Sequence, residues 1–546
     1  MKHRAVKRRN VVIGLGATAG AAAVGGIALT AQASTGTAGS KSKKASGSLV
    51  FDRNAYTELT TTITAVDGSE KEVTYHFWKA ITYVANPVDV EHQSLVVSVP
   101  VAIDGKAVDA TDAPILFTNS VGGYMPANVS AATGVGQAVM EMGNTGAPGA
   151  SASASPSTSA SPSPSASATG GTGPGGGGGA GGGVPNLAEI ALAAGYVVVE
   201  PGARGRSLVD ADGVYYGTAP AVIVDLKAAI RYLRANKGRI PGNTDRIVSA
   251  GGSAGGALSA LLGASGDSPL YDKYLKEAGA ADASDAVFAA AEWCPITDLE
   301  HADGAYEYCW GTSATKSGSQ VDQTVSKDLK SQFATYQASL KLKGINGFGP
   351  LTAANYDEYL VETYLQPAAA TYLKSLSDSA RSAYLAKNTF ITWDGDKATF
   401  TWDGFVSHVG TRKKSTPAFD AFDLSAGENN LFGTGTTKAR HFTLYSLRHQ
   451  GSSSARLADD IPELLNLMNP MYFIKKRNPG RSKHWWIRVG TNDTDSSPII
   501  VGNLAASLDG IGDDVDSLMY WDAGHGANND PAAFLDWIAD VSGHKK

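Results

Sequence analysis

Ser253 is the residue whose surroundings most clearly indicate chemistry. It lies in the motif Gly-Gly-Ser-Ala-Gly-Gly at 251–256, after a strand-like run at 246–250 and before a helix-like run at 257–262. Small residues two before and two after a serine permit a sharp strand-to-helix turn that lifts the hydroxyl above a sheet edge. The motif is short enough to occur by chance in a glycine-rich loop, but the flanking strand and helix favour a nucleophilic serine.

A nucleophilic serine needs a base, and the base needs a carboxylate that orients it. Asp493 follows a strand-like run at 485–489, and His525 follows another at 517–521. Singly, these residues could be a turn former and a surface histidine. Together, in the order Ser, Asp, His found in α/β-hydrolases, they predict acyl transfer in which His525 takes the proton of Ser253.

The developing negative charge of acyl transfer needs hydrogen-bond donors. The backbone N–H of Ala254 lies at the start of the predicted helix, where it can face an oxyanion. We expect the second donor from Gly122 in the loop at 119–124, which partly resembles a His-Gly-Gly-Gly motif. The glycines of this loop are equally typical of a plain turn.

Strands and helices alternate along most of the chain. Two strand-like runs at 59–64 and 73–77 flank a turn at Asp67-Gly68, which predicts a hairpin. Further strands are expected at 94–99, 114–117, 196–199 and 287–291, with helices at 187–194 and 222–233. This alternation predicts an α/β fold of the α/β-hydrolase type, in which helices flank a mostly parallel central sheet.

The pattern changes after Cys294. Residues 318–390 predict amphipathic helices, a hairpin is expected at Asp394-Gly395, and 403–457 is aperiodic. At about 146–183 the composition falls to Ser, Ala, Pro and Gly, which predicts a disordered insertion. The domains expected are a signal peptide at 1–33, a flexible leader at 34–48, an α/β-hydrolase core at 49–295, a lid at 296–458 and the rest of the core at 459–546.

The N-terminus predicts export. Five Lys and Arg residues lie in the first ten positions, an apolar run follows at 11–30, and Ala31-Gln32-Ala33 forms an A-x-A cleavage site. A membrane anchor is the alternative, but the run is rich in Gly and Ala and only weakly hydrophobic. We expect cleavage after Ala33 and a secreted protein without stable membrane insertion, by the twin-arginine route that Arg8-Arg9 suggests or by ordinary secretion.

Charge and cysteine content exclude some functions. The 546 residues carry a formal net charge of −6 and no basic stripe, so we expect no nucleic-acid partner. The two cysteines, Cys294 and Cys309, could form a disulfide outside the cell or remain buried thiols. Neither has metal-site spacing, and we expect no metal and no cofactor.

Several motifs together resemble the bacterial tannases. These motifs lie at 201–206, 216–221, 251–257, 293–299, 416–420, 427–430, 493–495 and 524–526. The resemblance covers most of residues 50–540 and implies an α/β-hydrolase with an inserted lid that hydrolyses galloyl esters. It places the family's triad on Ser253, Asp493 and His525.

The resemblance also implies how a substrate is bound. Bacterial tannases hold the galloyl ring through a lysine and two carboxylates, and Lys414, Glu428 and Asp495 match those motif positions. Carboxylates accept hydrogen bonds from phenol groups, and an ammonium favours a phenolate-like oxygen. On its own, Lys414 in the basic run 412–414 is more typical of a solvated charge.

The sequence departs from related enzymes in two ways. The Ser/Pro/Gly insertion interrupts the core between the Gly122 loop and the next helix. The cysteines that flank the serine and histidine in the fungal tannase and feruloyl esterase group are missing beside Ser253 and His525.

The leading prediction is a secreted serine esterase that releases gallic acid from galloyl esters, with depside bonds as an open extension. The small-molecule partner is then a phenolic ester. One alternative is a feruloyl, phenolic-acid or general carboxylesterase of the same fold. Another is a catalytically inactive extracellular binding module, against which the complete set of Ser, Asp and His argues.

Overall fold

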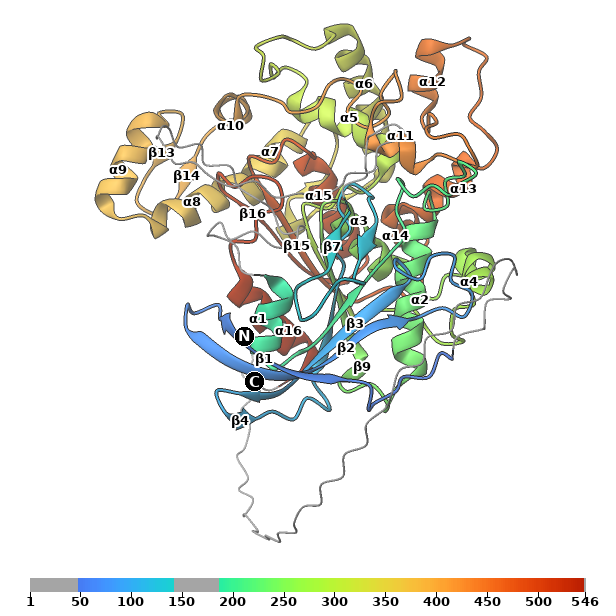
Figure 1. The fold of residues 1–546 in the computed structure, drawn as a ribbon. Coiled ribbons are helices and arrows are strands. Elements are labelled where there is room, and N and C mark those ends of the chain that lie inside the picture. The colour runs from blue at the N-terminus through green and yellow to red at the C-terminus, as the bar shows by residue number, and fades with distance from the viewer. Residues whose placement is uncertain (1–47, 142–185, 545–546) are drawn as a thin grey trace, which may run out of the picture. The chain divides into compact units, whose positions relative to one another are not determined.

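A ten-stranded sheet forms the centre of the computed structural model, which describes residues 48–141 and 186–544 (Figure 1). In spatial order its strands are β1 (Thr57–Thr64), β2 (Glu70–Thr82), β3 (Ser94–Ile103), β8 (Val197–Pro201), β5 (Pro114–Thr118), β9 (Asn243–Gly252), β10 (Ala289–Trp293), β15 (His484–Gly490) and β16 (Asp514–Tyr520), with β4 (Lys106–Ala107) paired to β3. Neighbours are antiparallel from β1 to β8 and parallel from β8 to β16. The predicted α/β class with a mostly parallel sheet is confirmed.

The antiparallel edge begins with the predicted hairpin. β1 and β2 pair from Thr57 opposite Phe77 to Thr64 opposite Glu70. At the turn, the Asp67 carboxylate accepts hydrogen bonds from the backbone and hydroxyl of Ser69, and Gly68 adopts a φ of 80°. A side chain that bonds two residues ahead and a glycine at positive φ are what a tight turn requires.

Helices cover both faces of the parallel strands, with α1 and α16 on one side and α2 on the other in Figure 1. The helices of the sheet region are α1 (Leu187–Ala193), α2 (Ala221–Ala235), α3 (Ala254–Ala264), η1 (Pro269–Tyr271), α4 (Asp272–Ala278), α15 (Pro498–Asp509) and α16 (Pro531–Ser542). Every residue of α3 is buried. Its small residues permit this close packing, since a Cβ added at Gly263 would lie 2.7 Å from Trp485 and from Ala290.

Residues 294–483 separate β10 from β15 in the sequence, although the two strands are parallel neighbours. The elements between them are α5 (Leu299–Trp310), α6 (Gln323–Leu340), β11 (Lys343–Gly344), η2 (Ile345–Gly347), β12 (Gly349–Pro350), α7 (Tyr356–Leu360), η3 (Val361–Leu365), α8 (Gln366–Ser375), α9 (Asp378–Lys387), β13 (Thr392–Trp393), β14 (Ala398–Thr399), α10 (Trp402–Val409), α11 (Gly427–Leu431), α12 (Leu444–Gln450), α13 (Ile461–Leu467) and α14 (Pro470–Lys475). The predicted hairpin at Asp394-Gly395 is confirmed by the pairing of β13 with β14. The whole segment 294–483 is therefore an insertion in the sequence that leaves β10 and β15 paired directly with each other.

The stretch 403–457 is not without helices, contrary to its aperiodic sequence. Most of α10 and all of α11 and α12 fall within it. Thr401 and Thr443 cap two of these helices by accepting a hydrogen bond from a backbone N–H three residues ahead. Helices of five to eight residues are too short to display a clear 3.6-residue period, so caps are their main sequence signal.

Other expectations fall outside the described part of the chain. The signal peptide, nearly all of the flexible leader and the Ser/Pro/Gly insertion lie within 1–47 and 142–185. Within 48–141 and 186–544, no helix is both long and apolar enough to cross a bilayer. The one strand pair not yet named, β6 (Ala127–Asn128) with β7 (Val139–Met140), lies directly before the insertion.

Candidate active site

Ser253 sits at a sharp turn between β9 and α3. Its φ of 57° and ψ of −123° are unusual for a residue with a side chain, and the helix begins at the next residue. The Ser253 amide donates a hydrogen bond to the carbonyl of Trp293 at the end of β10, 2.9 Å away. A strained strand-to-helix turn of this kind is how α/β-hydrolases expose a nucleophile.

Two glycines of the motif are needed because backbone segments approach closely. A Cβ on Gly251 would lie 2.4 Å from the carbonyl oxygen of Gly255. A Cβ on Gly255 would lie 2.6 Å from the carbonyl oxygen of Val121 and from the side-chain oxygen of Asn119. These separations are shorter than any side chain tolerates, so the spacing of small residues around Ser253 has a steric cause.

Asp493 and His525 meet beyond the ends of β15 and β16. Nδ1 of His525 lies 2.9 Å from Oδ2 of the buried Asp493. The same carboxylate accepts hydrogen bonds from the amides of Asp495 and Ser496, and from the Ser496 hydroxyl. These bonds fix the carboxylate, and a fixed carboxylate in turn fixes the orientation of the imidazole.

The other ring nitrogen of His525 faces a cysteine. Its Nε2 lies 3.9 Å from Sγ of Cys294, the residue directly after β10. Among the hydrogen bonds of the described residues, none joins Ser253 to His525. Such bonds in substrate-free hydrolases are often long and tighten only once substrate is bound.

The surroundings of His525 change its pKa. Burial alone would lower the pKa of His525, but its hydrogen bonds with Asp493 and Cys294 outweigh burial and raise this pKa above the ordinary value of 6.5. A raised pKa favours the imidazolium, which is the form a histidine base takes after it accepts a proton.

The loop containing Gly122 is fastened to the serine turn through Asn119. The Asn119 amide donates to the carbonyls of Ala250 and Gly255, at 3.0 and 3.1 Å, and its oxygen accepts from the amide of Val121. Ala254 is the first residue of α3, so its N–H has no acceptor within the helix. The loop and the serine turn, from which both predicted oxyanion donors come, are thus held together by one side chain.

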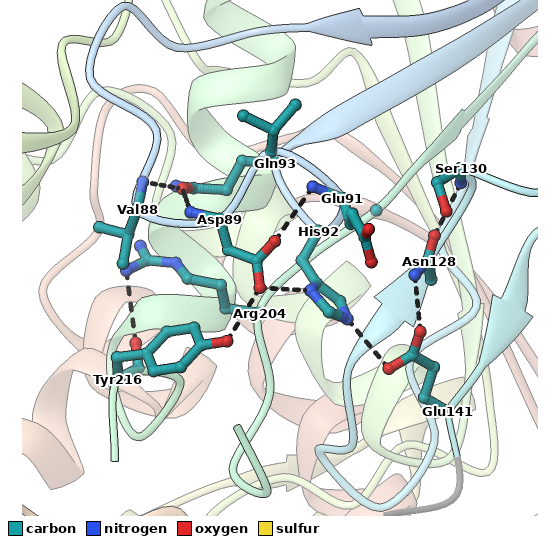
Figure 2. Close-up of polar contacts among 12 residues, drawn as sticks. Val88, Asp89, Glu91, His92, Gln93, Asn128, Ser130, Glu141, Arg204 and Tyr216 are labelled. Atoms are coloured by element: carbon teal, nitrogen blue, oxygen red, sulfur yellow. Dashed lines mark hydrogen bonds and ion pairs between the residues drawn. The ribbon is translucent and has the colours of Figure 1, made fainter. Parts of the chain in front are cut away.

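A polar network holds the segment that follows this loop, from Asn128 to Glu141 (Figure 2). His92 lies between two carboxylates, with Nδ1 2.8 Å from Asp89 and Nε2 3.1 Å from Glu141. Glu141 also accepts a hydrogen bond from Asn128, and Asp89 accepts one from the Tyr216 hydroxyl. Burial opposes ionisation of Asp89, but its hydrogen bonds with His92 and Tyr216 lower its pKa below the usual value. The network joins the strand pair β6–β7 to two other segments of the core.

Of the three residues matched to galloyl binding, Lys414 and Asp495 lie on loops and Glu428 lies in the short helix α11. Nζ of Lys414 lies 3.8 Å from the centroid of the Phe419 ring. Glu428 is buried in α11, and Asp495 forms an ion pair of 2.7 Å with the neighbouring Lys413. The described residues contain no direct ion pair between Lys414 and either carboxylate.

Parts of the chain are similar in sequence to known esterases. The family model BD-FAE matches residues 183–340. Esterase LipQ of Mycobacterium tuberculosis is 39% identical over 90 residues, which is 16% of this chain and 20% of LipQ. Esterase LipC of the same organism is 38% identical over 76 residues, 14% of this chain and 19% of LipC. The chain therefore matches only about a fifth of each of these esterases.

Solved structures match over nearly the whole chain. A tannin acyl hydrolase in complex with 3,4-dihydroxybenzoate has a TM-score of 0.73 and 33% identity, over 90% of this chain and 99% of that one. The tannase of Fusobacterium nucleatum has a TM-score of 0.72 and 33% identity, over 91% and 99%. The tannase of Lactobacillus plantarum has the same score and identity, over 91% and 100%.

This chain belongs to the bacterial tannase family. The fold is that of the α/β-hydrolases, and the protein is a carboxylic ester hydrolase. Both expectations from the sequence are confirmed, and the inactive binding module is excluded. The roles of individual site residues in this tannase stay predictions.

Two residues that the sequence did not single out connect the substrate-binding candidates of this tannase. The buried hydroxyl of Tyr306 donates to the carbonyl of Thr494 at 2.7 Å and accepts from the amide of Lys414 at 3.1 Å. Arg206 donates to the carbonyl of Gly123 at 2.7 Å and to the side chain of Asn430 in α11 at 3.0 Å. Tyr306 thus links the backbone of Lys414 to the backbone of Thr494, the residue before Asp495. Arg206 links the Gly122 loop to α11, the helix that contains Glu428.

The cysteines of this tannase are both free and buried. Sγ of Cys309 lies 3.1 Å from the hydroxyl of Ser497, and burial raises the pKa of Cys309 to about 12. Cys294 lies against His525 instead. The disulfide that the sequence left open is not formed in this structure.

A buried ion pair holds the segment of Lys414 in place, and breaking it should destabilise the tannase. Arg412 and Glu307 are both fully buried, and Nη1 of Arg412 lies 2.8 Å from Glu307. Arg412 also donates to the carbonyls of Lys414 and Ser415, each at 2.9 Å. We expect Glu307→Gln to leave a buried guanidinium without its counter-charge and to lower the free energy of unfolding by about 3–5 kcal/mol.

Urea unfolding followed by tryptophan fluorescence measures this loss. The control is Glu463→Gln, which removes an exposed pair with Lys273 and should leave the free energy of unfolding nearly unchanged, because solvent screens such pairs. Equal stabilities of the two variants would contradict the role given to the buried pair.

Proposed function

We propose that this tannase hydrolyses galloyl esters and releases gallic acid through an acyl-enzyme on Ser253. The observation that carries the proposal is the Asp493–His525 pair of 2.9 Å, located at the sheet edge where Ser253 forms its strained turn. Parallel strands place their carboxyl ends on one edge, and β9, β15 and β16 end there. Related structures hold ethyl gallate, a galloyl ester, and 3,4-dihydroxybenzoate, a phenolic acid with one ring hydroxyl fewer.

In the first half of the reaction, Oγ of Ser253 attacks the ester carbonyl while Nε2 of His525 takes its proton. Asp493 keeps the ring in the tautomer that presents Nε2 and stabilises the imidazolium. The amides of Ala254 and Gly122 donate to the oxyanion. His525 then protonates the leaving alcohol, and the galloyl group stays on Ser253.

In the second half, His525 takes a proton from water, and the resulting hydroxide attacks the galloyl carbonyl. Ser253 leaves and recovers its proton from His525, and gallic acid departs. Every bond that forms or breaks involves only substrate, water and these side chains, so the reaction needs no further reagent.

Ring recognition falls to Lys414, Glu428 and Asp495. Glu428 is buried, so an unpaired carboxylate there is costly unless a phenol group donates to it. Asp495 already pairs with Lys413, and a phenol would share that carboxylate. The loops and helices at 296–458 act as the lid that carries Lys414 and Glu428 over the sheet edge.

The test compares methyl gallate with methyl ferulate and methyl 4-hydroxybenzoate on purified protein. A site built around ring hydroxyls should reject rings that lack them, and we expect kcat/KM for methyl gallate to exceed both others by at least about 100-fold. A preference for methyl ferulate would instead support the phenolic-acid esterase of the same fold.

A variant of Glu428 tests whether this carboxylate recognises the ring hydroxyls. Glu428→Gln should lower kcat/KM for methyl gallate by about 10–100-fold, because a hydrogen bond to a charged group is lost, and should change hydrolysis of methyl 4-hydroxybenzoate much less. The matched variant Glu463→Gln, on the exposed face of α13, should change neither.

We also infer that the enzyme is exported. The basic first ten residues, the apolar run at 11–30 and the A-x-A site at 31–33 support this. Expression of the full chain in a bacterial host should yield protein in the extracytoplasmic fraction whose N-terminal residue is Ser34, as read by Edman sequencing or intact mass. Full-length protein confined to the cytoplasm would contradict export.

A further inference from the structure

Cys294 occupies a position that ester hydrolysis does not require. It follows β10, has a φ of 43°, and its amide donates to the carbonyl of Arg488 in β15. Its buried Sγ lies 3.9 Å from Nε2 of His525, the nitrogen that must accept the proton of Ser253. A sulfur ligand and an imidazole ligand therefore point at the same small volume beside the nucleophile.

The two atoms are spaced for one metal ion. Zinc bonds sulfur at about 2.3 Å and imidazole nitrogen at about 2.0–2.1 Å, so the two bonds together span roughly 4.4 Å. Because 3.9 Å is less than this sum, one ion can contact both atoms at a bent angle, as tetrahedral coordination requires.

Asp493 completes the resemblance to a zinc site. A histidine that binds zinc through one nitrogen usually donates from the other to a carboxylate, which fixes the ring and raises its basicity. Nδ1 of His525 makes this contact with Asp493 at 2.9 Å. Across 48–141 and 186–544, Cys294, Asp493 and His525 form the one group of three such side chains whose ligand atoms lie within 4.8 Å of one another.

We propose that Cys294 and His525 form a binding site for a thiophilic divalent cation, represented by Zn²⁺, and that its occupancy inhibits the esterase. Inhibition rests on the proposed function, since it follows from His525 being the base. Binding itself does not depend on that role.

The chemistry of binding is reversible coordination. The Cys294 thiol loses its proton to solvent as the zinc–sulfur bond forms. A protonated His525 likewise gives up its Nε2 proton to solvent, and the freed lone pair of Nε2 bonds to zinc, so no electron transfer occurs. His525 can then no longer accept the Ser253 proton, and hydrolysis stops. Solvent can supply the remaining ligands, because His525 is only partly buried.

The activity test uses the full-length chain and methyl gallate. Vicinal hydroxyls of gallate bind divalent cations, so free Zn²⁺ is set with a metal buffer at each point. We expect inhibition that a chelator reverses and that Mg²⁺ does not reproduce, because magnesium prefers oxygen ligands. In Cys294→Ala and Cys294→Ser, the half-inhibitory Zn²⁺ concentration should rise by at least about 100-fold relative to each variant's own uninhibited rate, since even outer partners of a metal site are worth 10–100-fold.

The matched control is Cys309→Ser. Cys309 is as buried as Cys294 but contacts Ser497, so its replacement should leave zinc inhibition unchanged. Zinc sensitivity that persists in both Cys294 variants, or disappears in Cys309→Ser, would overturn the proposal.

A binding test keeps the metal site separate from the catalytic assignment. Co²⁺ is titrated into Ser253→Ala, which should be unable to turn over ester, and the cobalt–thiolate charge-transfer band in the near ultraviolet is recorded. The band should appear, disappear in the double variant with Cys294→Ala, and be displaced by Zn²⁺. If the band appears but zinc leaves the esterase active, the ion binds away from the working base and the inhibitory role is wrong. If no band appears, the site itself is wrong, whatever the activity results.

Discussion

Replacing Ser253 with alanine should lower kcat for methyl gallate by at least about 10⁴-fold. The alanine has no oxygen to form the acyl-enzyme, and removing the nucleophile of a serine hydrolase leaves only the contribution of the oxyanion donors and of substrate binding. Ala254 and Gly122 should be unaffected, so the variant should still bind gallate with nearly the affinity of the unaltered enzyme. Release of acid measured under saturating ester, together with gallate titration, separates the two effects.

The control for this variant is Ser379→Ala, on the exposed face of α9, which should leave kcat unchanged. A specific rival is also tested, because the described residues show a hydrogen-bond contact to Nε2 of His525 from Cys294, at 3.9 Å, and none from Ser253. If Ser253→Ala kept more than a tenth of the activity while Cys294→Ala lost it, the nucleophile would be Cys294.

Asp493→Asn should have the second largest effect, a fall in kcat of about 10⁴-fold. An asparagine can donate from its amide to Nδ1, which stabilises the wrong tautomer of His525 and puts a proton on the nitrogen that must act as base. The amides of Asp495 and Ser496 would still find a side-chain oxygen, so the loop should keep its structure. The loss should therefore lie in kcat and not in folding.

The same substitution should move the pH dependence. The hydrogen bond to Asp493 helps to raise the pKa of His525 above 6.5, and His525 acts as base only when neutral. Removing the carboxylate lowers this pKa, so the acid limb of kcat/KM should shift to lower pH. Its surroundings raise the pKa of His525 to about 11, so a profile recorded from pH 5 to 11 on both proteins measures the shift. An acid limb that moves to higher pH would contradict the role of Asp493.

A second Asp–His pair provides the control. Oδ2 of Asp514 lies 2.9 Å from Nδ1 of His484, at the opposite ends of the same two strands, and Asp514 is exposed. Asp514→Asn removes the same type of contact and should change neither kcat nor the pH profile.

The sequence by itself determined the fold class and the class of enzyme. It predicts Ser253, Asp493 and His525 as the catalytic residues because each follows a run of strand-forming residues, and parallel strands bring their carboxyl ends to one edge. The glycines at 251 and 255 indicate the turn in the sequence, because a tight strand-to-helix turn leaves no room for a Cβ at these positions. The hydrophobic periodicity and the turn residues that reveal helices, strands and turns extend over only a few residues. They therefore predict local elements.

Only the tertiary structure decided which distant side chains meet. Nothing in the sequence around Cys294 indicates that its sulfur lies 3.9 Å from His525, since that contact depends on the order of β9, β10, β15 and β16 in the sheet. The same holds for Tyr306, whose hydroxyl joins the backbones at 414 and 494. Local patterns predict elements, but contacts across the chain depend on strand order and side-chain packing, which no short stretch of sequence encodes.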